Sequence, residues 1–122
     1  MKPETKFWQD VRKIKSEIYW TRLENLSSLG TPDVLGYNNS GLFFTVELKV
    51  TKTNKITISP HQIAFHLIHP HNTFILVKAL LTKEVKLYEG SRIKDLVACG
   101  LKLEPCSLGL EASLKKLSKL VA

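Results

Sequence analysis

The 122-residue chain has little of several features that define common protein classes. It has only two cysteines, Cys99 and Cys106, which match no zinc-binding spacing, and we expect both to be reduced thiols. No apolar run approaches the ~18 residues that a membrane span needs. The first residues, Met1 to Lys6, lack the apolar core of a signal peptide. These absences predict no membrane association and a cytoplasmic location, which would be the host cytoplasm if the gene is viral.

Acidic residues are also scarce relative to basic ones. The chain has 11 Asp and Glu against 18 Lys and Arg, which gives a net charge of +7. This balance favours polyanionic partners such as nucleic acid, without distinguishing DNA from RNA, although a role in solubility alone stays open. The length suits one domain with a single core, and no repeat or linker divides the chain. We therefore expect residues 1–122 to form a single domain.

The spacing of apolar residues predicts alternating helices and strands. The nearly continuous apolar run at 74–80 predicts a central strand that is buried on both faces. The order of elements predicts an α/β fold in which a central mixed β-sheet is flanked by helices. The expected helices are 4–17, 61–69, 93–98 and 110–121, and the expected strands are 18–23, 32–37, 42–50, 74–80 and 85–88, with 56–58 extending a strand.

Two carboxylates and a lysine follow one another on the second and third of these strands. Pro32 precedes Asp33, a turn at 38–41 joins the strands, and Glu47 and Lys49 share one face by the two-residue period of a strand. Such charges are costly to bury unless something binds them. Asp33 and Glu47 could share a divalent cation, with Lys49 neutralising developing charge beside it. This chemistry is that of phosphodiester cleavage; a surface ion pair is the simpler alternative.

These residues resemble the motif of the PD-(D/E)xK nuclease superfamily. The chain is most similar to its small Holliday junction resolvase-like and VRR-type nucleases, some of them phage-encoded. The resemblance covers about residues 4–80, and a C-terminal helical part at about 91–122 lies beyond it. It rests on Gly30-Thr31-Pro32-Asp33-Val34, Val46-Glu47-Leu48-Lys49 and the helix start Ser59-Pro60-His61-Gln62.

The resemblance implies a restriction-endonuclease-like core and an Mg²⁺- or Mn²⁺-dependent endodeoxyribonuclease. Its products would carry 5′-phosphate and 3′-hydroxyl ends. Small members tend to read DNA shape, which favours branched or junction DNA, a homodimer and a role such as DNA recombination. The alternative is a non-catalytic nucleic-acid-binding module that retains the nuclease fold.

The resemblance also assigns a role to each motif residue. Asp33 and Glu47 would bind the metal through hard oxygen atoms, with the backbone carbonyl of Leu48 as a third ligand. Lys49 would stabilise the attacking hydroxide or the transition state. Gln62 would position the attacking water or contact the phosphate, because its amide can donate and accept hydrogen bonds at once.

An upstream acidic residue completes the site in the nucleases that this chain resembles. The candidates are Glu4, Asp10, Glu17 and Glu24, and the sequence leaves the choice open. Glu24 comes first because it closely precedes the Pro-Asp corner, and Glu4 comes second because it lies on the first helix. Each of the four is otherwise a solvated surface charge.

Further residues are expected around the site. Arg22, Lys52 and Lys55 would hold the DNA backbone, since they lie near the motif in chain order. The histidines at 61, 66, 69 and 71 lack the spacing of a zinc site and are expected on the surface or facing DNA. Four aromatic residues, Tyr19, Trp20, Phe43 and Phe44, are expected in the core rather than in a base-stacking platform, which is the alternative.

An apolar stripe marks the last expected helix. Leu110, Leu114, Leu117 and Val121 recur at helical spacing, with lysines outside the stripe. Such a stripe needs cover, and either the chain's own sheet or a partner subunit could supply it.

Overall fold

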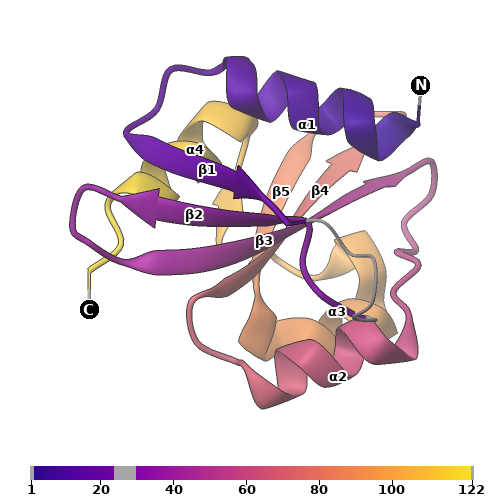
Figure 1. The fold of residues 1–122 in the computed structure, drawn as a ribbon. Coiled ribbons are helices and arrows are strands. Elements are labelled where there is room, and N and C mark those ends of the chain that lie inside the picture. Colours follow the sequence, from indigo (N-terminus) through magenta and orange to yellow (C-terminus); the bar gives the residue numbers. More distant parts are fainter. Residues whose placement is uncertain (1, 24–29, 122) are drawn as a thin grey trace.

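A computed structural model describes residues 2–23 and 30–121. Its centre is a six-stranded sheet in the order β1-β2-β3-β4-β5-β6, in which only the β3–β4 pair is parallel (Figure 1). The crossover that a parallel pair requires contains α2. The elements are α1 (Pro3–Lys13), β1 (Ile18–Arg22), β2 (Val34–Asn38), β3 (Phe43–Thr51), α2 (Pro60–Ile68), β4 (Thr73–Ala79), β5 (Val85–Glu89), α3 (Ile93–Cys99), β6 (Ser107–Leu108) and α4 (Leu110–Ser118).

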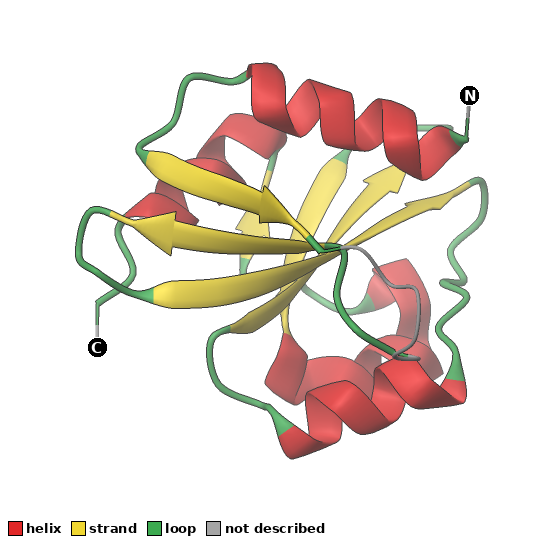
Figure 2. Ribbon diagram, in the orientation of Figure 1, coloured by secondary structure: helices red, strands yellow, loops and turns green. Residues whose placement is uncertain are grey.

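Helices lie on both faces of the sheet. Figure 2 shows α1 on one side of the strands and α2 on the other. One apolar cluster joins the sheet to α1 and α4 through residues such as Phe7 and Leu114, and a second joins it to α3 through Leu96. Ile75 and Leu76 on β4 belong to different clusters and are both fully buried. The prediction of a mixed sheet flanked by helices, with a central strand at 74–80, is therefore confirmed.

The β2–β3 hairpin turn is fixed by one buried side chain. The Asn38 side-chain carbonyl accepts hydrogen bonds from the backbone N–H groups of Ser40 and Leu42 at 3.0 and 3.1 Å. Its amide nitrogen donates to the carbonyls of Leu117 and Leu120 at 3.0 and 2.9 Å. The turn predicted at 38–41 is thus present, and the same residue satisfies carbonyl groups at the end of α4.

The apolar stripe of α4 is covered by the chain's own core. Leu114 and Leu117 are buried in the cluster that α1 and α4 share with the sheet, and Leu110 packs against its edge. Helix α4 ends at Ser118, and Val121 is 72 % exposed beyond it. The intrachain alternative is therefore correct for this stripe, and the predicted helix at 110–121 was three residues too long.

Three other segments differ from their predicted structure. Helix α1 ends at Lys13 rather than at residue 17, yet Ile14 still packs against the core from the connection that follows. Residues 56–58 are not a strand, because their alternating isoleucines pack under the α3 cluster without pairing to the sheet. The short strand β6 was not predicted, since two residues are too few to show a period.

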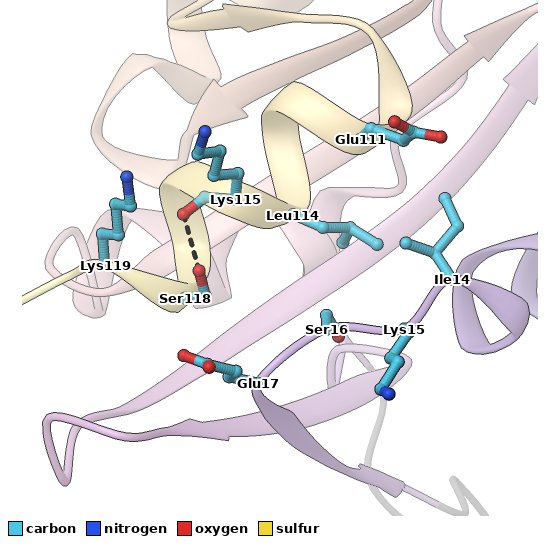
Figure 3. Close-up of a pocket in the computed structure, with 9 residues that line it drawn as sticks. All are labelled: Ile14, Lys15, Ser16, Glu17, Glu111, Leu114, Lys115, Ser118 and Lys119. Atoms are coloured by element: carbon cyan, nitrogen blue, oxygen red, sulfur yellow. Dashed lines mark hydrogen bonds between the residues drawn. The ribbon is translucent and has the colours of Figure 1, made fainter.

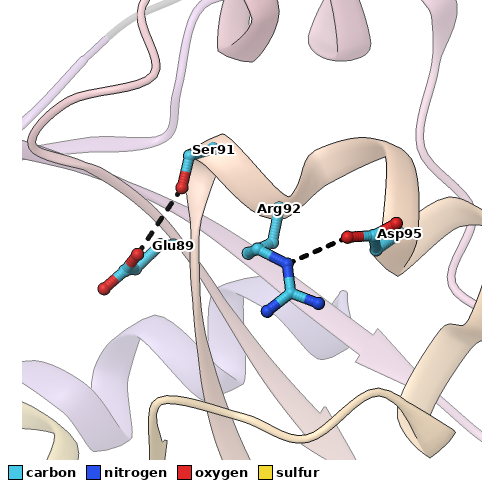
Figure 4. Close-up of polar contacts among 4 residues, drawn as sticks. All are labelled: Glu89, Ser91, Arg92 and Asp95. Carbon is cyan, nitrogen blue, oxygen red and sulfur yellow. Dashed lines mark hydrogen bonds and ion pairs between the residues drawn. The ribbon is translucent and has the colours of Figure 1, made fainter.

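The corner between β5 and α3 depends on close packing at Gly90. A side chain at this position would clash with the hydroxyl of Thr73 on β4, so only glycine fits. The polar contacts around the corner lie at the surface, where an ion pair contributes about 0–1 kcal/mol. Figure 4 shows these contacts, in which Ser91 donates to Glu89 at 3.5 Å and Arg92 to Asp95 at 2.9 Å.

None of the helices in the described part of the chain combines the length and the apolar character that crossing a bilayer requires.

Candidate active site

The Asp33 side chain accepts a backbone hydrogen bond just beyond the last residue pair of β2 and β3. The ladder ends where Val34 pairs with Val46, and the backbone N–H of Leu48 then donates to Asp33 Oδ2 at 2.7 Å. The N–H and C=O of one strand residue point to the same neighbouring strand, so the Leu48 carbonyl also lies on the side of Asp33. The Asp33 carboxylate is therefore held between the positions of Glu47 and Lys49.

Glu47 is a buried carboxyl group on β3, with only 3 % of its surface exposed. Its Oε2 accepts a hydrogen bond from Gln62 Nε2 at 3.0 Å, whereas its buried Oε1 has no hydrogen-bond partner within the described residues. Burial, then the charge and hydrogen bonding of Asp33, raise the pKa of Glu47 to about 9, while Lys49 lowers it. Without a cation, Glu47 therefore holds a proton at neutral pH; a cation bound between the two groups would allow both to ionise.

Gln62 joins the acidic and basic groups of the site. It donates to Glu47, and its Oε1 accepts a hydrogen bond from the Lys49 ammonium at 2.9 Å. The same oxygen accepts from the backbone N–H of Ser59 at 3.1 Å, while Ser59 Oγ accepts from the Gln62 N–H at 3.2 Å. This reciprocal pair is a capping box at the start of α2. The helix cap therefore fixes the side chain that orients Glu47 and Lys49.

Gly30 brings the Asp33 loop against the start of α2. Its φ of +85° lies in the region that favours glycine, and a side chain there would clash with the backbone carbonyl of His61. The close approach of two backbones places the Pro-Asp corner beside the residue that precedes Gln62. The motif residues thus converge from three segments that are distant in sequence.

These residues line a cleft of about 460 Å³. Of the residues predicted for the site, the described ones at the cleft are Asp33, Glu47, Leu48, Lys49, Gln62, Arg22 and the upstream candidate Glu4. Lys2, the residue before α1, and Thr5 in its first turn also line the cleft, and neither was predicted because neither belongs to the motif. They reach the cleft because the start of α1 lies beside it in the fold, and the local sequence does not reveal that position.

Glu4 is the upstream acidic residue that the structure brings to the cleft. It lies in the first turn of α1 and lines the cleft beside Asp33. Asp10 instead lies 3.6 Å from the ammonium of Lys78, and Glu17 accepts a hydrogen bond from the β2–β3 turn. Glu24, the first choice from sequence, lies outside the described residues. Among the other three candidates, the second choice is the one near the site.

Two of the three predicted DNA contacts lie away from the cleft. Arg22 lines it and is exposed, but Lys52 lines a separate cleft of about 310 Å³ and Lys55 lines neither. A local turn explains the difference, because the Thr51 hydroxyl donates to the Lys55 carbonyl at 2.7 Å. Proximity in the chain therefore does not place these two lysines at the site, whereas Lys2 lies there.

One of the four histidines is buried. His66 Nδ1 lies 2.8 Å from the Gln62 carbonyl, and burial lowers the pKa of its imidazole. The expectation that the histidines lie on the surface is therefore wrong for His66, while the other three are exposed. No group of three or more His, Cys, Asp or Glu side chains suited to a metal occurs in residues 2–23 and 30–121. A cation at Asp33 and Glu47 would retain several waters, as Mg²⁺ commonly does.

A larger groove lies on the opposite face of the sheet and holds none of the motif residues. It has a volume of about 720 Å³ and runs between α4 and the connection from α1 to β1 (Figure 3). Ile14 and Leu114 give it an apolar floor. Its rim carries both signs of charge, from Lys15, Lys115, Lys119, Glu17 and Glu111. The smaller cleft is the better candidate, because it gathers a buried acid and its partners.

No protein-family model matches the chain, and a comparison with curated proteins finds no match in sequence either. The assignment of a function therefore depends on the chemistry of the cleft itself.

Proposed function

We propose that the chain is a divalent-metal-dependent endodeoxyribonuclease that hydrolyses DNA phosphodiester bonds. The observation that carries this proposal is a buried carboxyl group, Glu47, which lies beside Asp33 in an open cleft and keeps one oxygen without a partner within the described residues. Glu47 is buried and Asp33 is half-buried, so two adjacent acids here are costly for the fold. A site that binds a cation explains why the chain carries them.

The donor set fits a hard cation. Asp33 uses one carboxylate oxygen for the Leu48 N–H, which leaves the other for a ligand, and Glu47 Oε1 is available. With the Leu48 carbonyl, these groups supply the oxygen ligands that Mg²⁺ and Mn²⁺ prefer. The bound ion would polarise the scissile phosphate and lower the pKa of a coordinated water.

The remaining polar groups of the cleft would act on the transition state. Lys49 places an ammonium beside the two acids, where it stabilises negative charge that develops on the phosphate. Gln62 holds that ammonium through Oε1 and Glu47 through Nε2, so both groups keep their direction before substrate binds. The capping box keeps Gln62 itself in place.

A nucleic acid is the proposed substrate because exposed cations line the cleft, and the resemblance to the PD-(D/E)xK nucleases favours DNA. Arg22 and Lys2 line it, both side chains are exposed, and the whole chain carries a charge of +7. Such cations contact phosphates and fix the register of a nucleic acid. We propose that the enzyme selects branched or junction DNA, and that a homodimer would provide paired cuts on symmetric DNA. The apolar stripe of α4 is not available for that dimer.

A non-catalytic nucleic-acid-binding module is the second candidate. It is favoured by the hydrogen bonds that link Glu47 Oε2 through Gln62 to Lys49, because they hold these three side chains together without a substrate. Such a module would bind DNA in the same cleft without cleaving it.

A cleavage panel separates the two functions. Linear, nicked, flapped and four-way-junction DNA would be incubated with Mg²⁺, Mn²⁺, Ca²⁺ or a chelator. The nuclease is expected to cut with Mg²⁺ or Mn²⁺, to stop with the chelator, and to leave 5′-phosphate ends that DNA ligase can join. DNA binding without cleavage of any substrate in Mg²⁺ and Mn²⁺ would instead support the binding module.

A further inference from the structure

Three aromatic side chains form an exposed row across one face of β1, β2 and β3. Tyr19 is 75 % exposed, Tyr37 38 % and Phe43 58 %. The strand register pairs Tyr19 with Tyr37 and Tyr37 with Phe43, so their side chains project from the same face of the sheet. The rings of Tyr37 and Phe43 are in contact, with centroids 4.5 Å apart. We call these three residues the aromatic row.

The aromatic row lies opposite the core residues that neighbour it in sequence. Trp20 and Phe44 pack edge to face at 5.8 Å within the core, as predicted, whereas Tyr19 and Phe43 are exposed, so the prediction of core positions is wrong for these two. Single exposed apolar residues are common, but three in register on one face form a continuous surface. Helices α2 and α3 do not cover this end of the face (Figure 1).

The aromatic row shares its face with the candidate active site. The two-residue period of β3 puts Phe43, Glu47 and Lys49 on one side of the sheet. Four residues of strand separate Phe43 from Glu47, a distance of about 13 Å at ~3.3 Å per residue. This span corresponds to about four nucleotides at a stacked spacing of ~3.4 Å. One short DNA strand could therefore contact both ends of the face.

The cleft at one end of this face and the aromatic row at the other have side chains that complement single-stranded DNA. At one end, Arg22, Lys2 and Lys49 supply cations for phosphates. At the other end, the aromatic row supplies flat rings, on which unpaired bases of any sequence can stack. A duplex keeps its bases inside and offers such rings only sugars and phosphates. The row is also small for a stable dimer: at ~200 Å² per ring it exposes roughly 350 Å², against the ~800 Å² that each partner usually buries.

We infer that the aromatic row stacks on unpaired bases of a DNA strand whose backbone enters the acidic cleft. The inference rests on the proposed nuclease function and specifies its substrate. The favoured DNA has a single-stranded stretch of about four nucleotides next to the cut, such as a flap or a fork.

Metal-free binding measurements test this inference apart from cleavage. Fluorescence anisotropy in a chelating buffer would compare three labelled probes of equal length: a twelve-nucleotide thymidine strand, an abasic strand and a duplex. The test protein carries Tyr19→Leu with Phe43→Leu, which keeps apolar side chains but removes two ring faces. The matched control carries Tyr19→Phe with Phe43→Tyr, which keeps both rings. All four substitutions fall on exposed positions, and thermal unfolding would check that each variant stays folded.

The wild type is expected to bind the thymidine strand at least about 10-fold more tightly than the abasic strand, since stacking contributes about 5- to 150-fold in affinity per base. The leucine variant should lose this preference, the ring-retaining control should keep it, and all three proteins should bind the duplex equally. Equal binding of thymidine and abasic strands by the wild type would overturn the inference. So would a wild-type dimer that the leucine variant converts to a monomer, because the row would then be a subunit interface.

Failure of the inference is distinguishable from failure of the proposed function. Lys49→Ala, which should not cleave, is expected to keep the full preference for the thymidine strand because Lys49 lies away from the row. A wild type that prefers unpaired bases but cuts no DNA would refute the nuclease and leave the aromatic row as a binding site. A wild type that cuts DNA without this preference would refute only the inference.

Discussion

The two faces of the sheet differ in how completely helices cover them. Phe44, Val46 and Leu48 point to the layer of α1 and α4, and all three are buried in one apolar cluster. The opposite face is covered at β4 and β5, whereas on β3 it carries the acidic site and an exposed ring at Phe43. Neighbouring residues of the same strand therefore have different roles.

Because side chains alternate along β3, the residues that stabilise the fold lie on one face of the sheet and those of the proposed chemistry lie on the other. Apolar burial at about 25 cal/mol per Å² makes the covered face the main source of stability. The other face holds charges and rings that would stabilise the protein more if they were apolar and covered. Substitutions on the covered face should therefore reduce the free energy of unfolding, and those on the other face should reduce DNA cleavage or binding.

Lys49→Ala should have the largest effect on cleavage. Removal of a cation that acts on the transition state is expected to reduce the cleavage rate by roughly 10³-fold. DNA binding should change by only a few-fold, because Lys49 acts on the transition state rather than on docking. Single-turnover cleavage and anisotropy would measure the two quantities, with Lys52→Ala, outside the cleft, as the control. Retained cleavage in Lys49→Ala would show that the lysine is structural.

Phe43 and Phe44 are neighbours on opposite faces of the sheet, so they test most sharply how the two faces differ in their contribution to stability. Phe44→Ala should lower the free energy of unfolding by about 3–5 kcal/mol, because it leaves a cavity against Gly36. Phe43→Ala should cost under about 1 kcal/mol, since that ring is largely exposed. Urea denaturation of the two variants would measure both changes. Similar losses would mean that the face of Phe43 is covered in solution.

The pH dependence of stability should reveal Glu47. In the metal-free protein, folding raises the pKa of Glu47 from 4.5 to about 9. Between these values the folded state retains a proton that the unfolded state loses, so this group makes stability fall as pH rises. Glu47→Gln removes this loss of stability. The unfolding temperature of the variant should therefore rise relative to that of the wild type as the pH increases from 5 to 8.

The control for this pH effect is Glu84→Gln, which removes an exposed carboxylate. Its unfolding temperature should follow that of the wild type across the whole range. A difference between Glu47→Gln and wild type that does not grow with pH would show that Glu47 ionises normally in the fold.

The salt dependence of DNA binding should show the smallest change. Arg22→Ala is expected to flatten the plot of log affinity against log salt by about 0.7–0.9, the value for one lost phosphate contact. Lys52→Ala with Lys55→Ala should leave the slope unchanged, because neither residue lines the cleft. The reverse result would place the DNA path along the β3–α2 connection, as chain order alone suggests.

Much of the fold could be predicted because local patterns decide it. Within residues 2–23 and 30–121, helical and strand periods placed nine of the ten helices and strands, and the capping box at Ser59 marked the start of α2. The motif residues Asp33, Glu47 and Lys49 converged as predicted, since strand pairing and a short turn control their positions.

The remaining features depend on contacts between distant segments. Glu4 reaches the site because α1 crosses the sheet, and Gly30 packs on His61 although β2 and β3 separate the two in sequence. His66 is buried by the β5–α3 corner, which its own helix does not encode. The alternation that placed Glu47 also placed Phe43 on the same face, but no local pattern shows where the helices stop covering that face.

The central claim, that Asp33 and Glu47 hold a divalent cation, is tested most directly by calorimetric titration with Mn²⁺. We expect one weak Mn²⁺ site per chain, with proton release near pH 7 as Glu47 ionises. Asp33→Asn should abolish the binding, and Glu84→Gln should keep it. Equal Mn²⁺ binding by the wild type and Asp33→Asn would contradict the claim.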